Sequence, residues 1–249
     1  MKYAVFLFLK YPHWAYLSFM KKRHMIQMYC FLASVAGVAL LWGNVQADVS
    51  EYFGVHLDDK TKAQLVERIK EFQSSPEKAA SLKERIRHRT VLCKTCHGED
   101  GKSVQPGVPN LAAQNMDYLV DQLIRFRAGT RYDGWMTGLA KGFSNDDIVD
   151  IAVKYATMPP VFSDDGDKNL IPEGKSVFSE HCIKCHGVDG KGNKGYARLA
   201  GQRADYVVKI LKGFRERNGR RENPWMTAVS LRLNMEQIKA VASYVSHLK

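Results

Sequence analysis

The sequence predicts an all-α fold in which two small tandem domains follow a helical N-terminal extension. Apolar residues recur at helical spacing in the periodic segments, and no segment alternates with a period of two for long enough to predict a strand. One stretch of sequence also recurs 88–90 residues further along the chain, which indicates an internal duplication. The chain has 249 residues, 45% hydrophobic and 25% charged, which excludes a disordered chain and a polytopic membrane protein.

The N-terminus has the features of a Sec-type export signal, predicted for residues 1–47. It carries five Lys and Arg residues and no acidic residue, and an apolar run extends from Met25 to Trp42. Small residues follow and end at Ala47, where a signal peptide would be cleaved. We interpret residues 1–19 as an extension from a misplaced start. The predicted location is the periplasm, and an uncleaved signal would attach the protein to a membrane.

Residues 48–84 form the predicted helical extension. Apolar and charged residues alternate with helical spacing at 61–72 and at 77–91, and a Ser-Ser-Pro break at 74–76 separates the two segments. The second segment is expected to continue into the first tandem domain. The pattern indicates no function for this extension.

The duplication defines the two domains. Three matched motifs carry it: Cys-x-x-Cys-His-Gly at 93–98 and 182–187, Leu-Ala-x-Gln at 111–114 and 199–202, and Trp-Met-Thr at 135–137 and 225–227. They predict a first domain at 85–160 and a second domain at 173–249. A linker rich in proline and aspartate joins them at 161–172.

Two helices are expected after the cysteine motif in each domain. In the first domain they span 117–127 and a segment that runs from an N-cap at Ser144 to about Ala156. In the second domain they span 206–214 and 235–247. Glycine and proline interrupt the intervening stretches, for which no helix is predicted.

Each Cys-x-x-Cys-His motif is the attachment signature of c-type haem. The residues expected to hold two covalently bound haem c groups are Cys93, Cys96 and His97 in the first domain and Cys182, Cys185 and His186 in the second. The thiols would bind the porphyrin, and each histidine would bind the iron. A redox dithiol or a zinc ion held by the four cysteines is the alternative, and neither explains the histidine after each pair.

A methionine is the second axial ligand expected in each domain. Met136 and Met226 follow the motif histidines by 39 and 40 residues, and they recur at corresponding positions. A thioether ligand favours ferrous iron. Because it also fills the last coordination position, the pattern indicates electron transfer and no catalytic residue. Trp135 and Trp225 are expected to pack against the haem edges or in the core.

With these motifs, residues 85–249 resemble the dihaem cytochrome c₄ family. The resemblance implies two tandem class I cytochrome c domains and a periplasmic electron carrier, with a quinol-oxidising complex or a dehydrogenase as donor and a terminal oxidase as acceptor. It also implies that the Pro109 carbonyl accepts a hydrogen bond from the axial histidine, with Ala197 at the matching position. The alternative is an electron-transfer subunit of a periplasmic dehydrogenase, such as a sulfide-oxidising flavocytochrome.

The positive charge lies mainly in the second domain. The chain has a formal net charge of +11, from 37 Lys and Arg against 26 Asp and Glu. Without residues 1–47 the net charge is +6, and residues 173–249 alone hold +8, with 15 basic and 7 acidic residues. The second domain is therefore expected to dock on an acidic protein or an anionic membrane surface. No nucleic-acid partner is expected, because no recognition module is visible.

Overall fold

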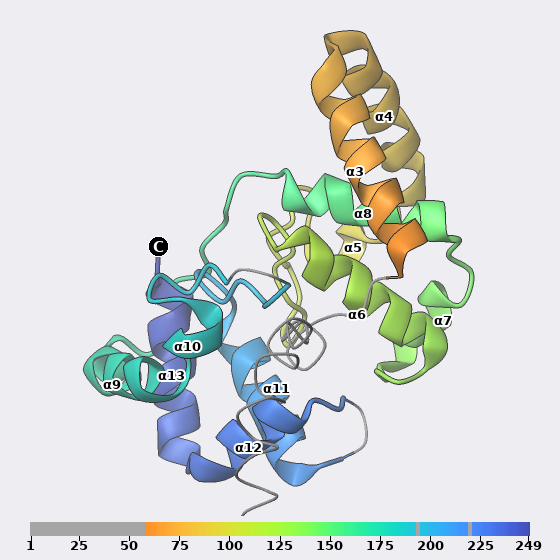
Figure 1. The fold of residues 1–249 in the computed structure, drawn as a ribbon. Helices are drawn as coiled ribbons and strands as arrows, with labels where there is room; N and C mark the ends of the chain where they lie inside the picture. Colours follow the sequence, from red (N-terminus) through yellow and green to blue (C-terminus); the bar gives the residue numbers. More distant parts are fainter. Residues whose placement is uncertain (1–57, 193–194, 219–220) are drawn as a thin grey trace, which may run out of the picture. The chain divides into compact units, whose positions relative to one another are not determined.

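The computed structural model describes residues 58–192, 195–218 and 221–249, which form helices joined by loops (Figure 1). These residues contain no β-strand, and one isolated bridge pairs Arg131 with Arg221. The predicted all-α class is confirmed. The signal peptide predicted for residues 1–47 lies outside the described residues. Within the described ranges, no helix has the length and apolar character needed to cross a membrane.

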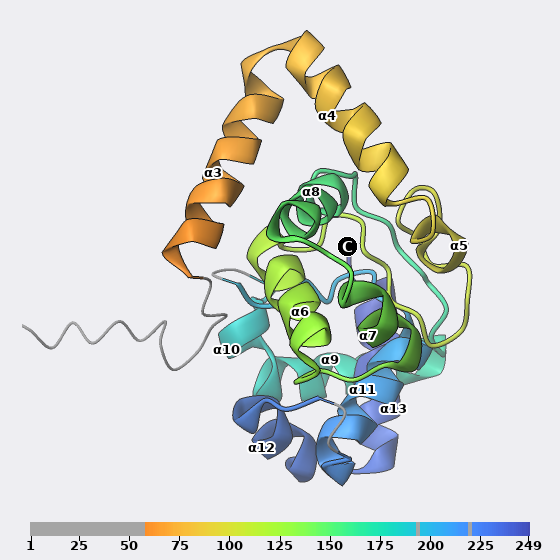
Figure 2. The same ribbon diagram turned by 90° about the vertical axis from the view of Figure 1, so that its right-hand side faces the viewer.

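The extension is a pair of helices, α3 (Asp59–Ser74) and α4 (Pro76–Arg89). They meet at the predicted break, where Ser75 ends α3 and its side chain accepts a hydrogen bond from the Lys78 N–H at the start of α4. Pro76 occupies the first position of α4, where its missing N–H costs no helical hydrogen bond. Both helices contact α8 (Asn145–Ala156) (Figure 2).

The first domain contains both of the helices that the sequence predicts. After the cysteine motif come α6 (Met116–Ala128), α7 (Gly134–Ala140) and α8. Ser144 and Asp147 form a capping box that fixes the start of α8. Residues of α4, α6 and α8 form one apolar core, in which Leu82, Val120 and Val149 are completely buried.

The second domain repeats this arrangement. Its elements are η1 (Lys168–Leu170), α9 (Ile171–His181), α11 (Ala204–Glu216), α12 (Pro224–Arg232) and α13 (Met235–His247). The side chains of Phe178, Leu233 and Ile238 lie at the centre of its core. The predicted helix at 235–247 is confirmed, and α9 begins inside the segment that the sequence assigns to the linker.

The two copies differ where their first and last helices cross. Gly174, eight residues before the cysteine motif, lies against α13 so closely that a Cβ atom would be 2.0 Å from the Ala240 carbonyl oxygen. The matching residue of the first domain is Arg85, and it faces Asp150, whose side chain is completely buried. The Arg85 Nε lies 3.1 Å from Asp150 Oδ2, and Arg68 of α3 places its Nε 3.2 Å from Oδ1. An ion cluster thus replaces the close helix contact and ties the extension to α8.

Candidate functional site

Each Cys-x-x-Cys-His motif folds into one helical turn, α5 (Lys94–His97) and α10 (Ile183–His186). The histidine N–H of each motif donates to the carbonyl of the first cysteine, at 2.9 Å in the first domain and 3.0 Å in the second. Gly98 and Gly187 end the two turns with the same φ of +79°, in the region that glycine adopts without strain. Because residues four apart in a helix share a face, each turn presents its first cysteine and its histidine on the same side.

The motif histidines are held in the form that a metal ion requires. His97 is 6% exposed and its Nδ1 lies 2.9 Å from the Pro109 carbonyl oxygen. His186 is 8% exposed and its Nδ1 lies 2.8 Å from the Ala197 carbonyl oxygen. A carbonyl can only accept, so Nδ1 carries the proton and Nε2 keeps a free lone pair.

Burial also lowers the pKa of both imidazoles, which favours the neutral form that a metal needs. The carbonyls of Pro109 and Ala197 were expected to accept a hydrogen bond from the motif histidine of their own domain, and this expectation is confirmed. A proline at this position is therefore not needed for the hydrogen bond.

The four motif cysteines are half-buried. Burial raises the pKa of Cys93 and raises the pKa of Cys182 to about 12, so neither has the low pKa of a redox-active thiol. Nowhere in the described part of the chain do three His, Cys, Asp or Glu side chains gather as a metal site would require. The raised pKa of the first cysteine in each motif argues against the redox dithiol.

The two candidate methionine ligands lie on helices that the sequence analysis did not predict. Met136 on α7 and Met226 on α12 are half-buried, and each borders the apolar core that the first motif cysteine of its own domain also borders. The Met136 N–H donates to the Asp133 side chain at 3.3 Å, and the Met226 N–H donates to Asn223 at 3.0 Å. Each methionine therefore occupies the first turn of a capped helix, where its backbone position is fixed.

The expectation of core packing for the neighbouring tryptophans is wrong. Trp135 is 84% exposed and Trp225 is 52% exposed. Both precede the methionine in the first turn of a short helix, on the side turned away from the core. The alternative expectation, contact with a haem edge, stays a prediction.

Two arginines that the sequence analysis did not select, the buried Arg131 and the half-buried Arg221, fit an anionic cofactor. Arg131 is 9% exposed and donates to the Tyr206 hydroxyl at 3.1 Å, and Arg221 donates to the Tyr118 hydroxyl. Within the described ranges neither guanidinium forms an ion pair with a carboxylate. Because a guanidinium forms strong charge-assisted hydrogen bonds with carboxylates, the pair suits the carboxylates that a haem carries at its edge. A signal was present in the sequence, since each arginine lies five residues before its methionine.

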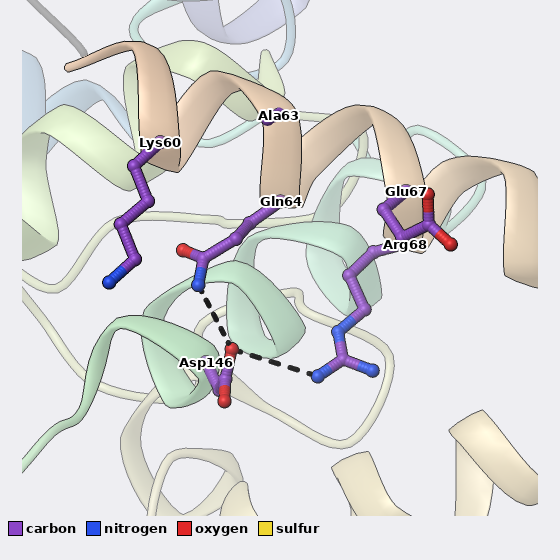
Figure 3. Close-up of a pocket in the computed structure, with 6 residues that line it drawn as sticks. All are labelled: Lys60, Ala63, Gln64, Glu67, Arg68 and Asp146. Atoms are coloured by element: carbon purple, nitrogen blue, oxygen red, sulfur yellow. Dashed lines mark hydrogen bonds and ion pairs between the residues drawn. The ribbon is translucent and has the colours of Figure 1, made fainter.

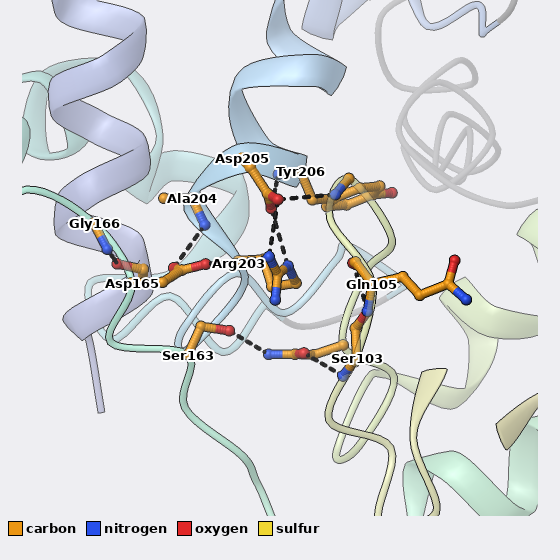
Figure 4. Close-up of polar contacts among 12 residues, drawn as sticks. Ser103, Gln105, Ser163, Asp165, Gly166, Arg203, Ala204, Asp205 and Tyr206 are labelled. Carbon is orange, nitrogen blue, oxygen red and sulfur yellow. Dashed lines mark hydrogen bonds and ion pairs between the residues drawn. The ribbon is translucent and has the colours of Figure 1, made fainter. Parts of the chain in front are cut away.

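Polar contacts join the two domains (Figure 4). Asp205 at the start of α11 accepts hydrogen bonds from the Arg203 guanidinium and from the Gly107 N–H of the first domain, the latter at 2.8 Å. Although burial alone would raise the pKa of Asp205, these donors outweigh burial and lower it. Ser163 of the linker accepts a hydrogen bond from the Asn110 side-chain amide at 2.9 Å. Hydrogen bonds between the domains therefore connect the loops next to the two sites.

An open depression of about 490 Å³ lies between α3 and α8 (Figure 3). Asp146 faces the depression. Its carboxylate accepts a hydrogen bond from the Gln64 side-chain amide at 3.4 Å and forms an ion pair with the Arg68 guanidinium at 3.8 Å. Asp146 is thus paired with two of the residues that line the depression. None of its lining residues belongs to either cysteine motif, so this depression is separate from the candidate haem sites.

Comparisons with known proteins agree with this geometry. A family model described as cytochrome c matches residues 171–249. Cytochrome c4 of Azotobacter vinelandii is 32% identical over 181 residues, which cover 64% of this chain and 86% of that protein. The crystal structure of reduced recombinant cytochrome c4 from Pseudomonas stutzeri matches with a TM-score of 0.61 at 32% identity, covering 67% of this chain and 98% of that one. The thiosulfate dehydrogenase electron acceptor of Thiomonas intermedia is 29% identical over 172 residues, which cover 62% of this chain and 77% of that protein.

Proposed function

The chain belongs to the cytochrome c4 family, and on that premise we propose that His97 and Met136 are the axial ligands of one haem iron and that His186 and Met226 are those of the other. The protein transfers electrons and carries two covalently bound haem c groups. The thioether bonds are assigned to the two cysteines of each motif, Cys93 with Cys96 and Cys182 with Cys185. The observation that carries the assignment is the paired histidine geometry, in which Nδ1 is engaged by a carbonyl and Nε2 is left for the metal.

Each haem, when bound, accepts and releases one electron. The residues of the chain hold the haem and adjust its reduction potential. The backbone carbonyls of Pro109 and Ala197 fix the orientation of the two imidazoles. Arg131 and Arg221 offer positive charge to the cofactor carboxylates and at the same time donate hydrogen bonds to tyrosines of the opposite domain. With two protein ligands on each iron, no coordination position is left for a substrate, which supports an electron carrier over an enzyme.

The proposed setting is the periplasm, with a quinol-oxidising complex or a dehydrogenase as donor and a terminal oxidase as acceptor. The similarity to a thiosulfate dehydrogenase electron acceptor favours one alternative, a dedicated acceptor for a periplasmic dehydrogenase. Purification of the native protein from its host separates the two. A stable complex with a dehydrogenase supports the dedicated acceptor, and an uncomplexed protein that reduces the terminal oxidase supports the general carrier.

Replacing a proposed methionine ligand tests the assignment directly. Met136→Ala and Met226→Ala should each remove half of the weak long-wavelength absorption band that ferric Met-ligated haem shows, and each should lower the reduction potential of one haem. The measurement is the optical spectrum of the oxidised protein with a potentiometric titration. Met158→Ala, on the loop after α8, is the matched control and should leave the band unchanged. A wild-type protein without the band, or single variants that keep all of it, would overturn the assignment.

The charge of the second domain predicts a strong salt dependence of docking. Lys212 and Lys239 are exposed, and reversing both to Glu should slow electron transfer to the terminal oxidase several-fold at low salt, because rim charges govern the association rate. Raising the ionic strength should remove most of this difference. The control reverses Lys70 and Lys78 of the extension, which changes the net charge equally and should have a small effect. Stopped-flow rates that rise with salt, or equal losses in both variants, would contradict the proposed docking face.

A further inference from the structure

The glutamine of each Leu-Ala-x-Gln motif reaches into the opposite domain. Gln202 is 6% exposed, and its Oε1 accepts a hydrogen bond from the Asn110 N–H at 2.8 Å while its Nε2 donates to the Asn110 carbonyl at 3.0 Å. Gln114, also 6% exposed, forms the same pair with Arg198, at 2.6 Å to the N–H and 2.9 Å to the carbonyl. Each glutamine therefore forms the same pair of hydrogen bonds with one backbone residue of the other domain.

Each glutamine binds the residue that comes immediately after the one whose carbonyl accepts a hydrogen bond from the axial histidine. The Pro109 carbonyl, which accepts from His97, and the Asn110 N–H, which donates to Gln202, belong to one peptide group. In the second domain, one peptide group likewise contains the Ala197 carbonyl that accepts from His186 and the Arg198 N–H that donates to Gln114. A continuous series of two hydrogen bonds thus joins each histidine to a glutamine of the other domain.

The glutamines are held in place by the last helix of their own domain. Ala113 and Gly201 precede them with left-handed φ angles of +55° and +76°, and their N–H groups donate to carbonyls of Tyr155 in α8 and Val245 in α13. A left-handed φ is unfavourable for alanine. The same backbone turn is nevertheless present in both domains, and it directs each glutamine across the boundary.

We propose that Gln202 and Gln114 are cross-domain positioning residues that tune the axial histidines His97 and His186, respectively. This inference rests on the proposed assignment of those histidines as ligands. A peptide N–H that donates to a good acceptor polarises its own peptide group, and its carbonyl then accepts more strongly from the imidazole. A stronger hydrogen bond at Nδ1 makes the imidazole a better electron donor to iron, which stabilises the ferric form and lowers the reduction potential.

Methionine is the most informative replacement, because it has a similar length and cannot serve as a good acceptor. In the holoprotein, Gln202→Met should raise the potential of the first-domain haem, and Gln114→Met should raise that of the second-domain haem. Gln202→Glu keeps an acceptor for the Asn110 N–H and should lower the reduction potential of the first-domain haem. Two readouts measure this: a redox titration followed by NMR, and the Nδ1–H resonances of ¹⁵N-labelled histidine in the reduced protein. The His97 proton should move to lower chemical shift in Gln202→Met.

The control variant is Asn115→Ala. The Asn115 side chain donates across the same boundary to the Tyr196 and Lys191 carbonyls but touches neither peptide group, so its loss should shift neither histidine proton. A purely structural role for the glutamines would move both haems alike, or only the haem of the mutated domain, and either result overturns the proposal. Optical spectra identify the variants that keep methionine ligation. If the wild-type protein lacks His/Met ligation, the proposed function itself fails, which these spectra distinguish from failure of the cross-domain effect.

Discussion

A variant in which Cys182 and Cys185 are both replaced by serine is expected to carry one covalent haem per chain instead of two. Serine cannot form the thioether bonds, and ligation by His186 and Met226 alone would leave the haem free to dissociate. The mass of the denatured protein and the haem absorbance per chain measure the result directly. The absorbance should fall by half, because the motif of the first domain is untouched.

The reciprocal variant, with Cys93 and Cys96 replaced by serine, is the matched control and should lose the other haem. Each single-haem protein then reports the potential of one site without overlap from its partner. Retention of two covalent haems in either variant would contradict the assignment of the cysteines. A protein that loses both haems from one double replacement would show that the two attachment sites depend on each other.

The second large effect concerns the ion cluster between the extension and α8. Asp150→Ala is expected to destabilise the first domain by about 1.5–3 kcal/mol, because it removes a completely buried carboxylate that binds half-buried guanidinium groups. The Asp150 side chain is completely buried and faces the Nε atoms of three arginines, Arg68, Arg85 and Arg89, at 3.2, 3.1 and 3.5 Å. Urea unfolding followed by circular dichroism should show the transition at lower denaturant concentration.

Asp146→Ala provides the comparison for this prediction. Asp146 also pairs with Arg68, but its side chain is 56% exposed, so the loss should be no more than about 1 kcal/mol. Protease cleavage within α3 and α4 should become faster in Asp150→Ala and change little in Asp146→Ala. Equal stability of the two variants would mean that burial of the Asp150 cluster contributes nothing to holding the extension.

Long amphipathic helices were predictable and short capped ones were not. The helix α13 begins and ends where the sequence indicates, because its apolar period and the Asn234 cap act locally. The helices α7 and α12 have 7 and 9 residues, and each begins with a residue that disfavours a helical interior, glycine or proline. Their N-caps, Asp133 and Asn223, were the available signal.

The candidate ligands could be selected from the duplication, whereas the contacts between the domains could not. Recurrence at matched positions singled out Met136 and Met226 without any knowledge of the fold. The hydrogen bonds of Gln114 and Gln202 depend on how one copy docks on the other, and no local pattern encodes a docking geometry. The same holds for Arg131, whose tyrosine partner lies 75 residues away in the sequence.

Because α4 crosses α8 differently from the way α9 crosses α13, these helices cannot be exchanged between the two domains. An unequal crossover that joined α4 to α13 would place the Arg85 side chain where Gly174 leaves no space for a Cβ atom against Ala240. The reciprocal product would join α9 to α8 and leave the buried carboxylate of Asp150 opposite a glycine. Both recombinants are expected to be less stable than the parent domains. A single-haem unit assembled from α4 and α13 would therefore fold less well than either existing domain.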